Sequence, residues 1–428
     1  MAYFQGFNRQ QICMFQTSYD EIIAEDNQVR LVDKFVSNLN AKEIGFTNSD
    51  PKHEGQVSYN PLDMCKLYIY GYLDGIRSSR RLQRECGRNQ EVIWLLGGLK
   101  PDFRTIADFR KDNTKALKKV FKEFVRFCMK LGLVKGEIIA IDGTKVKAMN
   151  SKSKNYTIST LKAQIKQIDK YLDKMNELDE NEKPIEEYTE KEINEKINKL
   201  ENRKAELQGN LKELEKNKET QKSLTDPDSR RMKLSKGGFD ICYNVQSAVD
   251  GENDIIVDFE VTNDGNDMNQ LENMSEKAEE VIKEDKEDKN KDEVKITVLA
   301  DKGYRNPKDI LECLQRGIIP NVYPPDGQNY YEFIIPFQKL HKNIKKHCII
   351  IMNGRNMKLR FYPDLELLKK RKQIVEHPFG TVKFWNHSSY FLTIGKTKTT
   401  AEMALSFLAY NVKRVVNILG VENAISMM

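Results

Sequence analysis

Three acidic residues lie where the pattern of their neighbours could bring them to one site. Asp142 and Asp301 each follow an apolar, β-branched run typical of a buried strand, so both carboxylates are predicted at the carboxyl end of a sheet. Glu376 lies in a helix-like stretch. Carboxylates alone form an oxygen-only ligand set, which suits Mg²⁺ or Mn²⁺ rather than zinc or copper. The sequence therefore predicts a site for two such ions, of the kind that supports in-line displacement at phosphorus.

Other interpretations of acids in this pattern stay open. An aspartate after a strand is often a turn former or a helix cap, although Gly143 and Gly303 would permit close backbone approach here. Asp264 and Asp267, in the run TNDGNDMN, are rival acids. The first lies in a glycine-rich turn and the second suits a helix cap, so we interpret both as structural or supporting residues.

A basic cluster stands out in the first third of the chain, where residues from about Ser18 to Val134 have a helical pattern. On one continuous helix its five arginines would share a face. A solvated face is one interpretation and a nucleic-acid-binding face the other, which neighbouring serines favour because they can donate to phosphate. Two further arginines lie in a predicted mobile loop at residues 225–238 and could contact a DNA backbone. The cluster comprises Arg77, Arg80, Arg81, Arg84 and Arg88, and the loop carries Arg230 and Arg231.

Residues 157–222 differ from their surroundings, being rich in Lys, Glu, Asn and Leu. Apolar residues recur at alternating spacings of four and three on two stretches around Pro184, which predicts an antiparallel coiled-coil hairpin inserted after the first strand. A self-contained hairpin and an intermolecular coiled coil are both open, and either could pair subunits or DNA ends. The seam includes Leu161, Ile165, Ile168, Leu172, Ile197, Leu200, Leu207, Leu211 and Leu214.

Length and composition are consistent with two or three domains in a cytoplasmic protein. The 428 residues carry a formal net charge of +6, so a polyanionic partner would be held by local patches. Seven cysteines are scattered without metal-ligand spacing, as in reduced intracellular proteins. No run approaches the ~18 apolar residues that cross a bilayer, and the first residues lack the apolar core of a signal peptide. We therefore expect a cytoplasmic location and no membrane contact.

The runs around the three acids, IDGTK at 141–145, ADKGY at 300–304 and VEHPFGTVK with Glu376 and Lys383, resemble those of the DDE transposases of bacterial insertion sequences. Those enzymes belong to the RNase H-like superfamily. Two further blocks are similar to one branch of the group and extend the resemblance over nearly the whole chain. They are YIYGYLDGIRSSRRLQRECGRNQEVIWLLGGLKPDFRTIADFRKDN before the site, and TDPDSRRM with YNVQSAVD and VTNDGND within it.

The resemblance implies an α/β fold with an RNase H-like catalytic domain over residues 136–428 and an all-α DNA-binding domain over residues 1–135. The catalytic domain would be interrupted by the coiled-coil insertion at 157–222 and by a strand-rich insertion at 326–368. The order of predicted elements, three strands, helix, strand, helix, strand and helix, agrees with such a domain.

The same resemblance implies a transposase that cuts and joins the terminal inverted repeats of its own insertion sequence. Asp142, Asp301 and Glu376 would hold two Mg²⁺ or Mn²⁺ ions, and Lys383 and Arg371 would contact DNA. The implied partners are double-stranded DNA, both terminal repeats and target, and a second copy of the chain in a homodimer. The protein would be associated with the bacterial nucleoid.

The chain departs from the family pattern before Glu376. Relatives carry an arginine four positions before the glutamate and a tyrosine further upstream, whereas this chain has Lys372 and Lys369 there and its nearest arginine is Arg371. Two alternatives therefore stay open, a related metal-dependent DNA nuclease and a catalytically decayed transposase that only binds DNA.

Overall fold

The computed structural model describes most of the chain. The described ranges are 18–50, 58–151, 154–180, 190–217, 219–234, 237–284, 295–336, 344–353 and 356–428, with the side chains of 175–180 and 190–193 left out.

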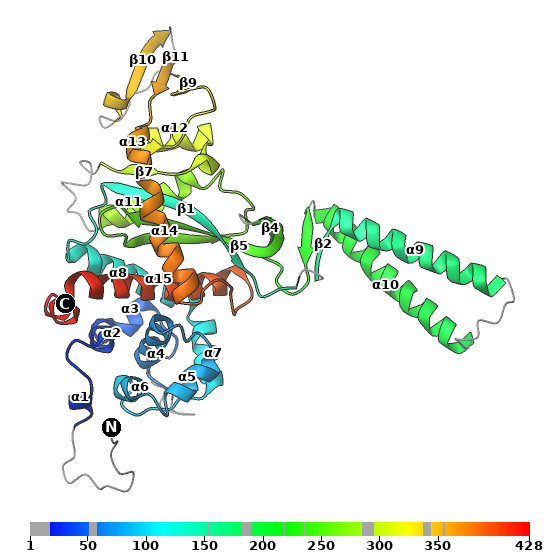
Figure 1. Ribbon diagram of the computed structural model, residues 1–428, viewed down its shortest axis with the longest axis horizontal. Coiled ribbons are helices and arrows are strands. Elements are labelled where there is room, and N and C mark those ends of the chain that lie inside the picture. Colours follow the sequence, from blue (N-terminus) through cyan, green and yellow to red (C-terminus); the bar gives the residue numbers. More distant parts are fainter. Residues whose placement is uncertain are drawn as a thin grey trace, which may run out of the picture.

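A mixed six-stranded sheet forms the centre of the molecule (Figure 1). β1 (Ile138–Lys147) pairs antiparallel with β5 (Phe239–Asp250) on one side and parallel with β7 (Thr297–Leu299) on the other. β8 (Ile319–Asn321) continues the sheet parallel to β7. At its other edge β5 pairs antiparallel with β6 (Ile256–Thr262) and with β4 (Arg230–Lys233). β1, β7 and β8 therefore run in one direction.

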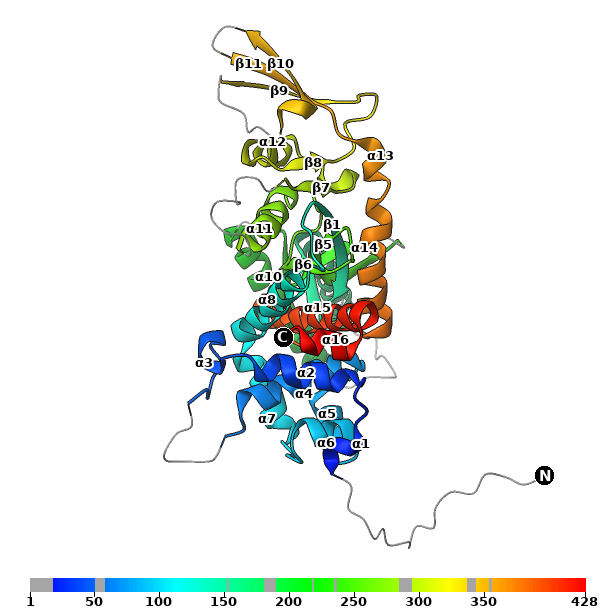
Figure 2. The same ribbon diagram turned by 90° about the vertical axis from the view of Figure 1, so that its left-hand side faces the viewer.

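Helices cover both faces of this sheet, which explains why its strands are apolar on both sides. α11 (Leu271–Glu284) and α14 (Arg371–Gly380) lie on opposite faces (Figure 2). α12 (Pro307–Arg316) connects β7 to β8, with Pro307 in its first turn and Gly317 in the left-handed conformation after its end. Its apolar side packs against α11 and β8.

The prediction of a helical N-terminal region is confirmed. Its longest helices, α4 and α8, pack against α15 (Lys396–Leu419), which also contacts β6. One continuous apolar core therefore joins these helices to the sheet. The helices are α1 (Tyr19–Ile22), α2 (Gln28–Ser37), α3 (Ala41–Ile44), α4 (Pro61–Leu73), α5 (Ser79–Glu85), α6 (Gln90–Leu95), α7 (Phe103–Asp112) and α8 (Thr114–Lys130), and α16 (Val421–Ser426) ends the chain.

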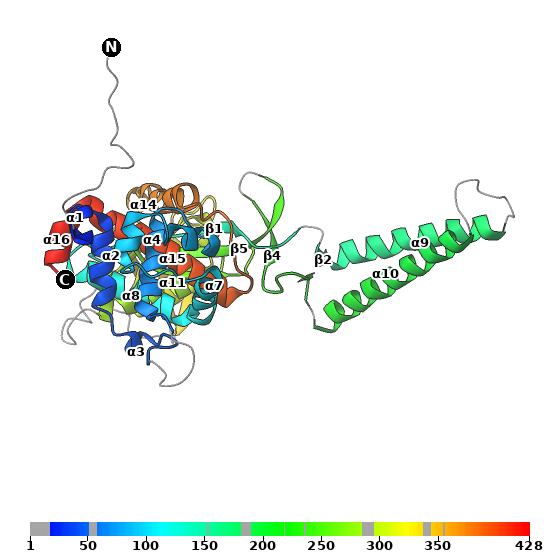
Figure 3. The same ribbon diagram turned by 90° about the horizontal axis from the view of Figure 1, so that it is seen from below.

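Two long helices project from the side of the sheet (Figures 1 and 3). α9 (Ile158–Glu180) leads away and α10 (Glu190–Asn217) returns, and their bases are joined by the short antiparallel pair β2 (Asn155–Thr157) and β3 (Gln221–Ser223). Leu161, Ile168, Leu172, Leu207 and Leu214 are buried in a cluster separate from the main core. The pair of helices thus covers its own apolar seam.

A second antiparallel sheet lies at one end of the molecule beside α12 (Figure 2). It contains β9 (Tyr331–Pro336), β10 (Cys348–Asn353) and β11 (Asn356–Phe361), with β11 in the middle. The chain then returns along the central sheet through α13 (Leu365–Leu368), α14 and the π-helical turn η5 (Thr381–Trp385). Within the described ranges, no helix is both long and apolar enough to cross a bilayer.

Candidate active site

The register of the central sheet places Asp142 and Asp301 side by side. The parallel pairing of β1 with β7 ends at Ala140 opposite Leu299, and each aspartate comes two residues later on its own chain. Side chains two apart on a strand point to the same face. The prediction that Asp142 ends its strand is wrong, because β1 continues to Lys147 through its pairing with β5. Asp142 instead lies in the part of β1 that pairs with β5 but no longer with β7.

Asp142 lies in a partly buried, charged setting. Its Oδ1 accepts a hydrogen bond from the Gly143 N–H at 2.9 Å, and its Oδ2 lies 3.5 Å from Nη1 of Arg371 on α14. Burial raises the pKa of the Asp142 carboxyl to about 6; the Arg371 charge opposes this rise, whereas Asp301 and Asp267 add to it. Negative charge is therefore concentrated at this edge of the sheet.

Asp267 is the third acid at this edge, and the sequence analysis interpreted it as a structural or supporting residue. Asn244 and Gln246 of β5 donate to its Oδ1 at 2.7 and 2.6 Å, and Lys145 lies 3.7 Å away. A Cβ at Gly143 would come within 2.5 Å of the Asp267 carboxylate, so only glycine fits there. Asp267 therefore does not cap α11, which begins at Leu271. A usable signal existed, because β6 runs parallel to β1 and the residues that follow β6 must reach the same edge.

Gln246 links Asp267 to the segment that carries Asp301. Its side-chain nitrogen donates to Asp267, and its oxygen accepts a hydrogen bond from the buried hydroxyl of Tyr304. Tyr304 belongs to the 3₁₀ turn η3 (Lys302–Tyr304), whose first residue is preceded by Asp301 as its cap; the Asp301 Oδ1 accepts from the Gly303 N–H at 2.7 Å. Burial raises the pKa of Tyr304 well above its usual range, and the nearby carboxylates contribute. The hydroxyl thus stays protonated and can donate.

Glu376 lies apart from the two aspartates. It is on the exposed side of α14, its side chain is 65% exposed, and its nearest cation is Lys372 one turn earlier, at 3.6 Å. Across the ranges that the structure describes, no three acidic, histidine or cysteine side chains surround a common metal position. The structure therefore brings together Asp142 and Asp301 of the predicted triad, with Asp267 beside them. Glu376, on the exposed side of α14, is outside this group.

Lys383 connects η5 to the strand that carries Asp142. Its Nζ donates to the hydroxyl of Thr144 and to the carbonyl of Lys145, the latter at 3.0 Å. Burial lowers the pKa of this lysine, and the Asp142 charge partly opposes the fall. Lys383 is therefore held by β1 close to Asp142, through its hydrogen bonds to Thr144 and Lys145.

The donor set at this edge fits a hard divalent cation. Asp142 and Asp301 present carboxylate oxygens from adjacent strands, and the raised pKa of Asp142 means that a neighbouring positive charge would stabilise its ionised form. Beside them, Nη1 of Arg371 is buried without a hydrogen-bond acceptor among the described residues. This nitrogen is ion-paired with Asp142 at 3.5 Å, and a guanidinium is also a good ligand for a phosphate oxygen.

The predicted basic face is smaller than the sequence indicated. α5 ends at Glu85, so Arg88 lies beyond it and pairs with Glu85. Arg77 precedes the helix and is only 5% exposed, so it cannot serve as a surface contact for DNA. Arg80, Arg81 and Arg84 are exposed and make no ion pair with any described residue. They are the part of the cluster that stays available to a phosphate backbone.

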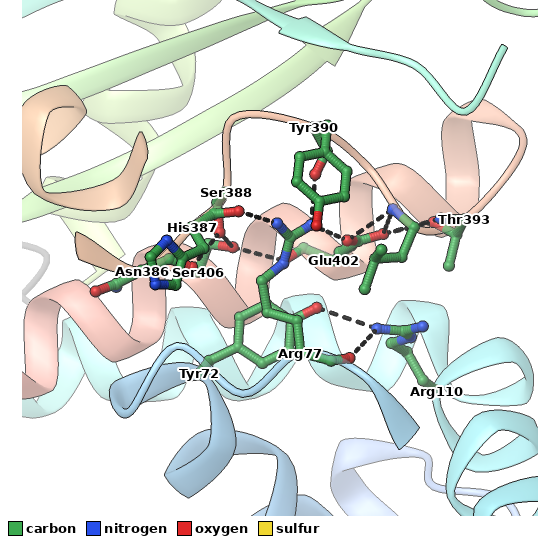
Figure 4. Close-up of polar contacts among 11 residues, drawn as sticks. Tyr72, Arg77, Arg110, Asn386, His387, Ser388, Tyr390, Thr393, Glu402 and Ser406 are labelled. Atoms are coloured by element: carbon green, nitrogen blue, oxygen red, sulfur yellow. Dashed lines mark hydrogen bonds and ion pairs between the residues drawn. The ribbon is translucent and has the colours of Figure 1, made fainter. Parts of the chain in front are cut away.

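Arg77 instead joins the N-terminal helices to the segment that follows η5 (Figure 4). Its guanidinium donates to the carbonyls of His387 and Tyr390 and to the carboxylate of Glu402 on α15. Glu402 is itself 1% exposed and also accepts from the backbone N–H groups of Leu392 and Thr393. This buried pair fixes the path of the chain immediately after Lys383 and η5.

The second pair of predicted contacts lies on a strand rather than on a mobile loop. Arg230 and Arg231 belong to β4, which pairs with the start of β5, while residues 235–236 of that segment lie outside the described ranges. Arg230 donates to the carbonyls of Pro227 and Ser229. Arg231 is exposed, and its guanidinium lies over the ring of Phe239 at 4.7 Å. Of the two, Arg231 is the more accessible.

Comparisons with known proteins agree on one family. Residues 182–412, more than half of the chain, match the family described as Transposase DDE domain. The match begins after Asp142 and includes Asp267, Asp301, Glu376 and Lys383. Residues 17–112 match the family described as Transposase domain (DUF772).

Solved structures and curated sequences add little. The cryo-EM structure of a piggyBac transposase synaptic complex with hairpin DNA aligns with 91% of this chain and 72% of that chain, at 8% identity and a TM-score of 0.33. At that score the likeness supports no inference. No curated protein matches the chain in sequence.

Proposed function

Because the chain belongs to the DDE transposase family, we propose that it cuts and joins DNA at the terminal inverted repeats of its own insertion sequence. The observation that carries this function is the register of β1 and β7, which sets Asp142 and Asp301 side by side past their last paired residues. Two neighbouring carboxylates, with the cations Arg371 and Lys383 beside them, are suited to phosphoryl transfer on a polyanion.

An RNase H-like catalytic domain is part of this proposal. The sheet order β6, β5, β1, β7, β8, with the first two joints antiparallel and the last two parallel, supports it. The projecting pair α9 and α10 is proposed as an antiparallel coiled-coil hairpin, supported by its separate apolar cluster. In a homodimer on DNA, that hairpin would pair two subunits or two DNA ends.

Asp142 and Asp301 would hold two Mg²⁺ or Mn²⁺ ions together with Glu376. Bound ions would activate a water or a DNA 3′-hydroxyl as the nucleophile and would stabilise the negative charge that develops on the leaving oxygen. Glu376 lies on α14, which packs against β1, so it would join the two aspartates from the helix side. Arg371 and Lys383 would each contact a phosphate, because one has an unfilled donor and the other is held at β1 by replaceable hydrogen bonds.

Positioning of the DNA would fall to exposed cations outside the site. Arg80, Arg81 and Arg84 on α5, with Arg231 on β4, present donors that phosphates can occupy. Such contacts orient a duplex without reading its sequence. Recognition of the terminal repeats would then need base contacts elsewhere on the N-terminal helices.

The test is cleavage of the element's own ends. Labelled duplexes carrying the DNA that flanks the gene on each side are incubated with the full chain, with Mg²⁺ or with EDTA. Cuts at the repeat boundaries that need Mg²⁺ and vanish in Asp301→Asn are expected. Failure to cut, or equal cutting of a scrambled duplex by wild type and Asp301→Asn, would refute the proposal.

A further inference from the structure

The small sheet of β9, β10 and β11 has two edges that differ in chemistry. β9, at one edge, carries Glu332 and ends at Pro336, and Glu332 pairs with Lys358 and Arg360 of the central strand β11. A charge and a proline are devices that stop a sheet edge from accepting another strand. β10, at the other edge, has the sequence CIIIMN and carries neither. Only the β9 edge is therefore protected against strand addition.

The apolar side chains of β10 are exposed on both faces of the sheet. Four consecutive residues, Ile349, Ile350, Ile351 and Met352, are between 40% and 56% exposed. β9, by contrast, alternates strictly between buried and exposed residues. Within the described ranges, no other strand pairs with the free side of β10. An exposed apolar patch of this kind marks a contact with another chain.

The hydrogen bonds of the sheet show which backbone groups of β10 are free. β10 pairs with β11 in continuous register from Cys348 to Asn353, and just before this ladder the Tyr362 N–H donates to the His347 carbonyl. In an antiparallel pair every second residue directs its N–H and C=O to the partner strand. His347 and every second residue after it therefore face β11. The residues between them direct both groups away from β11; they are Cys348, Ile350 and Met352.

We propose that β10 pairs antiparallel with β10 of a second copy of this chain, so that the two small sheets become one continuous sheet across a twofold axis. With the axis at Ile350, the outward N–H and C=O of Ile350 meet those of the same residue in the second copy. Cys348 then lies opposite Met352 of the second copy. Ile349 lies opposite Ile351, so every pair of side chains in this register is uncharged.

The chemistry of the strand selects a second copy as the partner. A twofold contact needs a self-complementary surface, and an antiparallel strand paired with itself provides one. The cations of the neighbouring β11 already have Glu332 as their counter-charge, so the contact needs no charged partner. Moving the axis from Ile350 to Ile349 would bring Lys346 opposite Met352, which favours the axis at Ile350.

The position of the sheet leaves room for this contact. β10 lies at the end of the molecule opposite the N-terminal helices (Figures 1 and 2). A second copy can therefore approach the edge without meeting those helices. The inference goes beyond the proposed function and requires no DNA.

Sedimentation velocity of the full chain without DNA, over a series of protein concentrations, is the first measurement. The wild-type chain should show a reversible equilibrium between monomer and dimer. Ile351→Lys should weaken the dimer by at least about 10-fold, because each lysine would lose water against Ile349 of the second copy. Ile334→Lys places the same charge on β9, at a residue that is 72% exposed in the same sheet. It is the matched control and should dimerise like wild type.

A disulfide tests the register without adding a charge. In Met352→Cys the new thiol would lie opposite Cys348 of the second copy, at a separation of paired strands that a disulfide can span. Mild oxidation with copper phenanthroline should yield a covalent dimer, and mass spectrometry of its peptides should identify the bond between positions 348 and 352. Cys348→Ser in the same background should remove that bond. Ile334→Cys, exposed on the other edge, measures cross-linking by random collision.

Each other outcome has a defined meaning. A monomer at every concentration would overturn the proposal and leave the β10 edge for a strand of a different protein. A dimer that Ile351→Lys leaves intact would also overturn it and would place the contact elsewhere, such as on the projecting helices α9 and α10. If Ile351→Lys and Ile334→Lys lose the dimer alike, the Met352→Cys bond decides. Cross-linking no greater than that of Ile334→Cys would then overturn the proposal, while cleavage of DNA ends stays a separate test of the proposed function.

Discussion

The two sides of the candidate active site are built differently. On the strand side, Gln246 bonds both Asp267 and Tyr304, which lies in the turn that Asp301 caps, and Asp142 accepts a hydrogen bond from the Gly143 N–H. On the helix side, Glu376 has one exposed lysine for a partner, and the position of its helix depends on Arg371 at one end and Lys383 at the other. The strand side is preorganised, whereas the helix side is docked against it.

This difference assigns different tasks to the two sides. Carboxylates fixed by a sheet can bind cations without rearrangement, which costs little when DNA arrives. Glu376 is exposed on α14 and is not held by the sheet, so its position depends on how that helix packs. Substitutions on each side should therefore have separable effects on cleavage, DNA affinity and stability.

The strand side should show the largest effect. Asp142→Asn removes a charged ligand and keeps the shape, so Mg²⁺-dependent cleavage should fall by about 1,000-fold or more. Affinity for the end duplex should stay within about threefold, because the exposed arginines are unchanged. Gel-based cleavage and anisotropy measure the two quantities, and a variant that still cuts at wild-type rate would remove Asp142 from the site.

The second-largest effect should come from the buried pair that supports the helix side, Arg77 with Glu402. Glu402→Gln leaves the buried Arg77 guanidinium without a counter-charge, and loss of one partner of a buried pair costs about 3–5 kcal/mol. Urea unfolding should show this loss. Glu366→Gln, which breaks the exposed pair with Lys369, is the control and should cost under about 1 kcal/mol. Equal losses in both variants would show that the Arg77–Glu402 pair does not anchor the segment after η5.

Asp267 provides a test of preorganisation within the strand side. Asp267→Ala removes the acceptor for Asn244 and Gln246, whereas Asp267→Asn keeps an acceptor oxygen. The alanine variant should raise the Mg²⁺ concentration for half-maximal cleavage by roughly 10-fold, the cost of about one or two hydrogen bonds, and the asparagine variant should lie close to wild type. Asp264→Ala, from the same turn, is the control. An asparagine variant as impaired as alanine would show that the charge of Asp267, not its acceptor, matters.

Sequence and structure agree best where a local pattern decides the outcome. Apolar runs predicted the strands before Asp142 and Asp301, and Pro61 correctly signalled the start of α4. Burial of Arg77 could not be predicted, because Glu402 lies 325 residues away and only the packed chain brings them together. For the same reason the five arginines looked like one surface. The partners of Asp267 could not be predicted either, because its neighbours resemble a helix cap while Asn244 and Gln246 lie on another strand.

Acidity provides a third test of the strand side. The pKa of Asp142 is about 6 in the folded chain against an ordinary value of 3.8. Between these values the folded state binds more protons than the unfolded state, so the free energy of unfolding falls as the pH rises from about 4 to about 6. The amide that replaces the carboxyl in Asp142→Asn cannot ionise. In EDTA, this variant should therefore gain about 2–3 kcal/mol of stability relative to wild type between pH 4 and pH 7.5. Parallel stability curves for the two proteins would contradict the raised pKa.

The smallest effect should come from Lys372. Its pair with Glu376 is exposed on both sides, so Lys372→Ala should change the free energy of unfolding by less than about 0.5 kcal/mol. Lys369→Ala, which breaks the exposed pair with Glu366 on α13, is matched to it in exposure. If α14 is only a docked support for Glu376, both variants should cut DNA within about threefold of wild type, because neither cation contributes more than an exposed pair does. Lys372 occupies the position where relatives carry an arginine, so a selective loss of cleavage in Lys372→Ala, with DNA affinity and stability unchanged, would show that the helix side contributes a phosphate contact of its own.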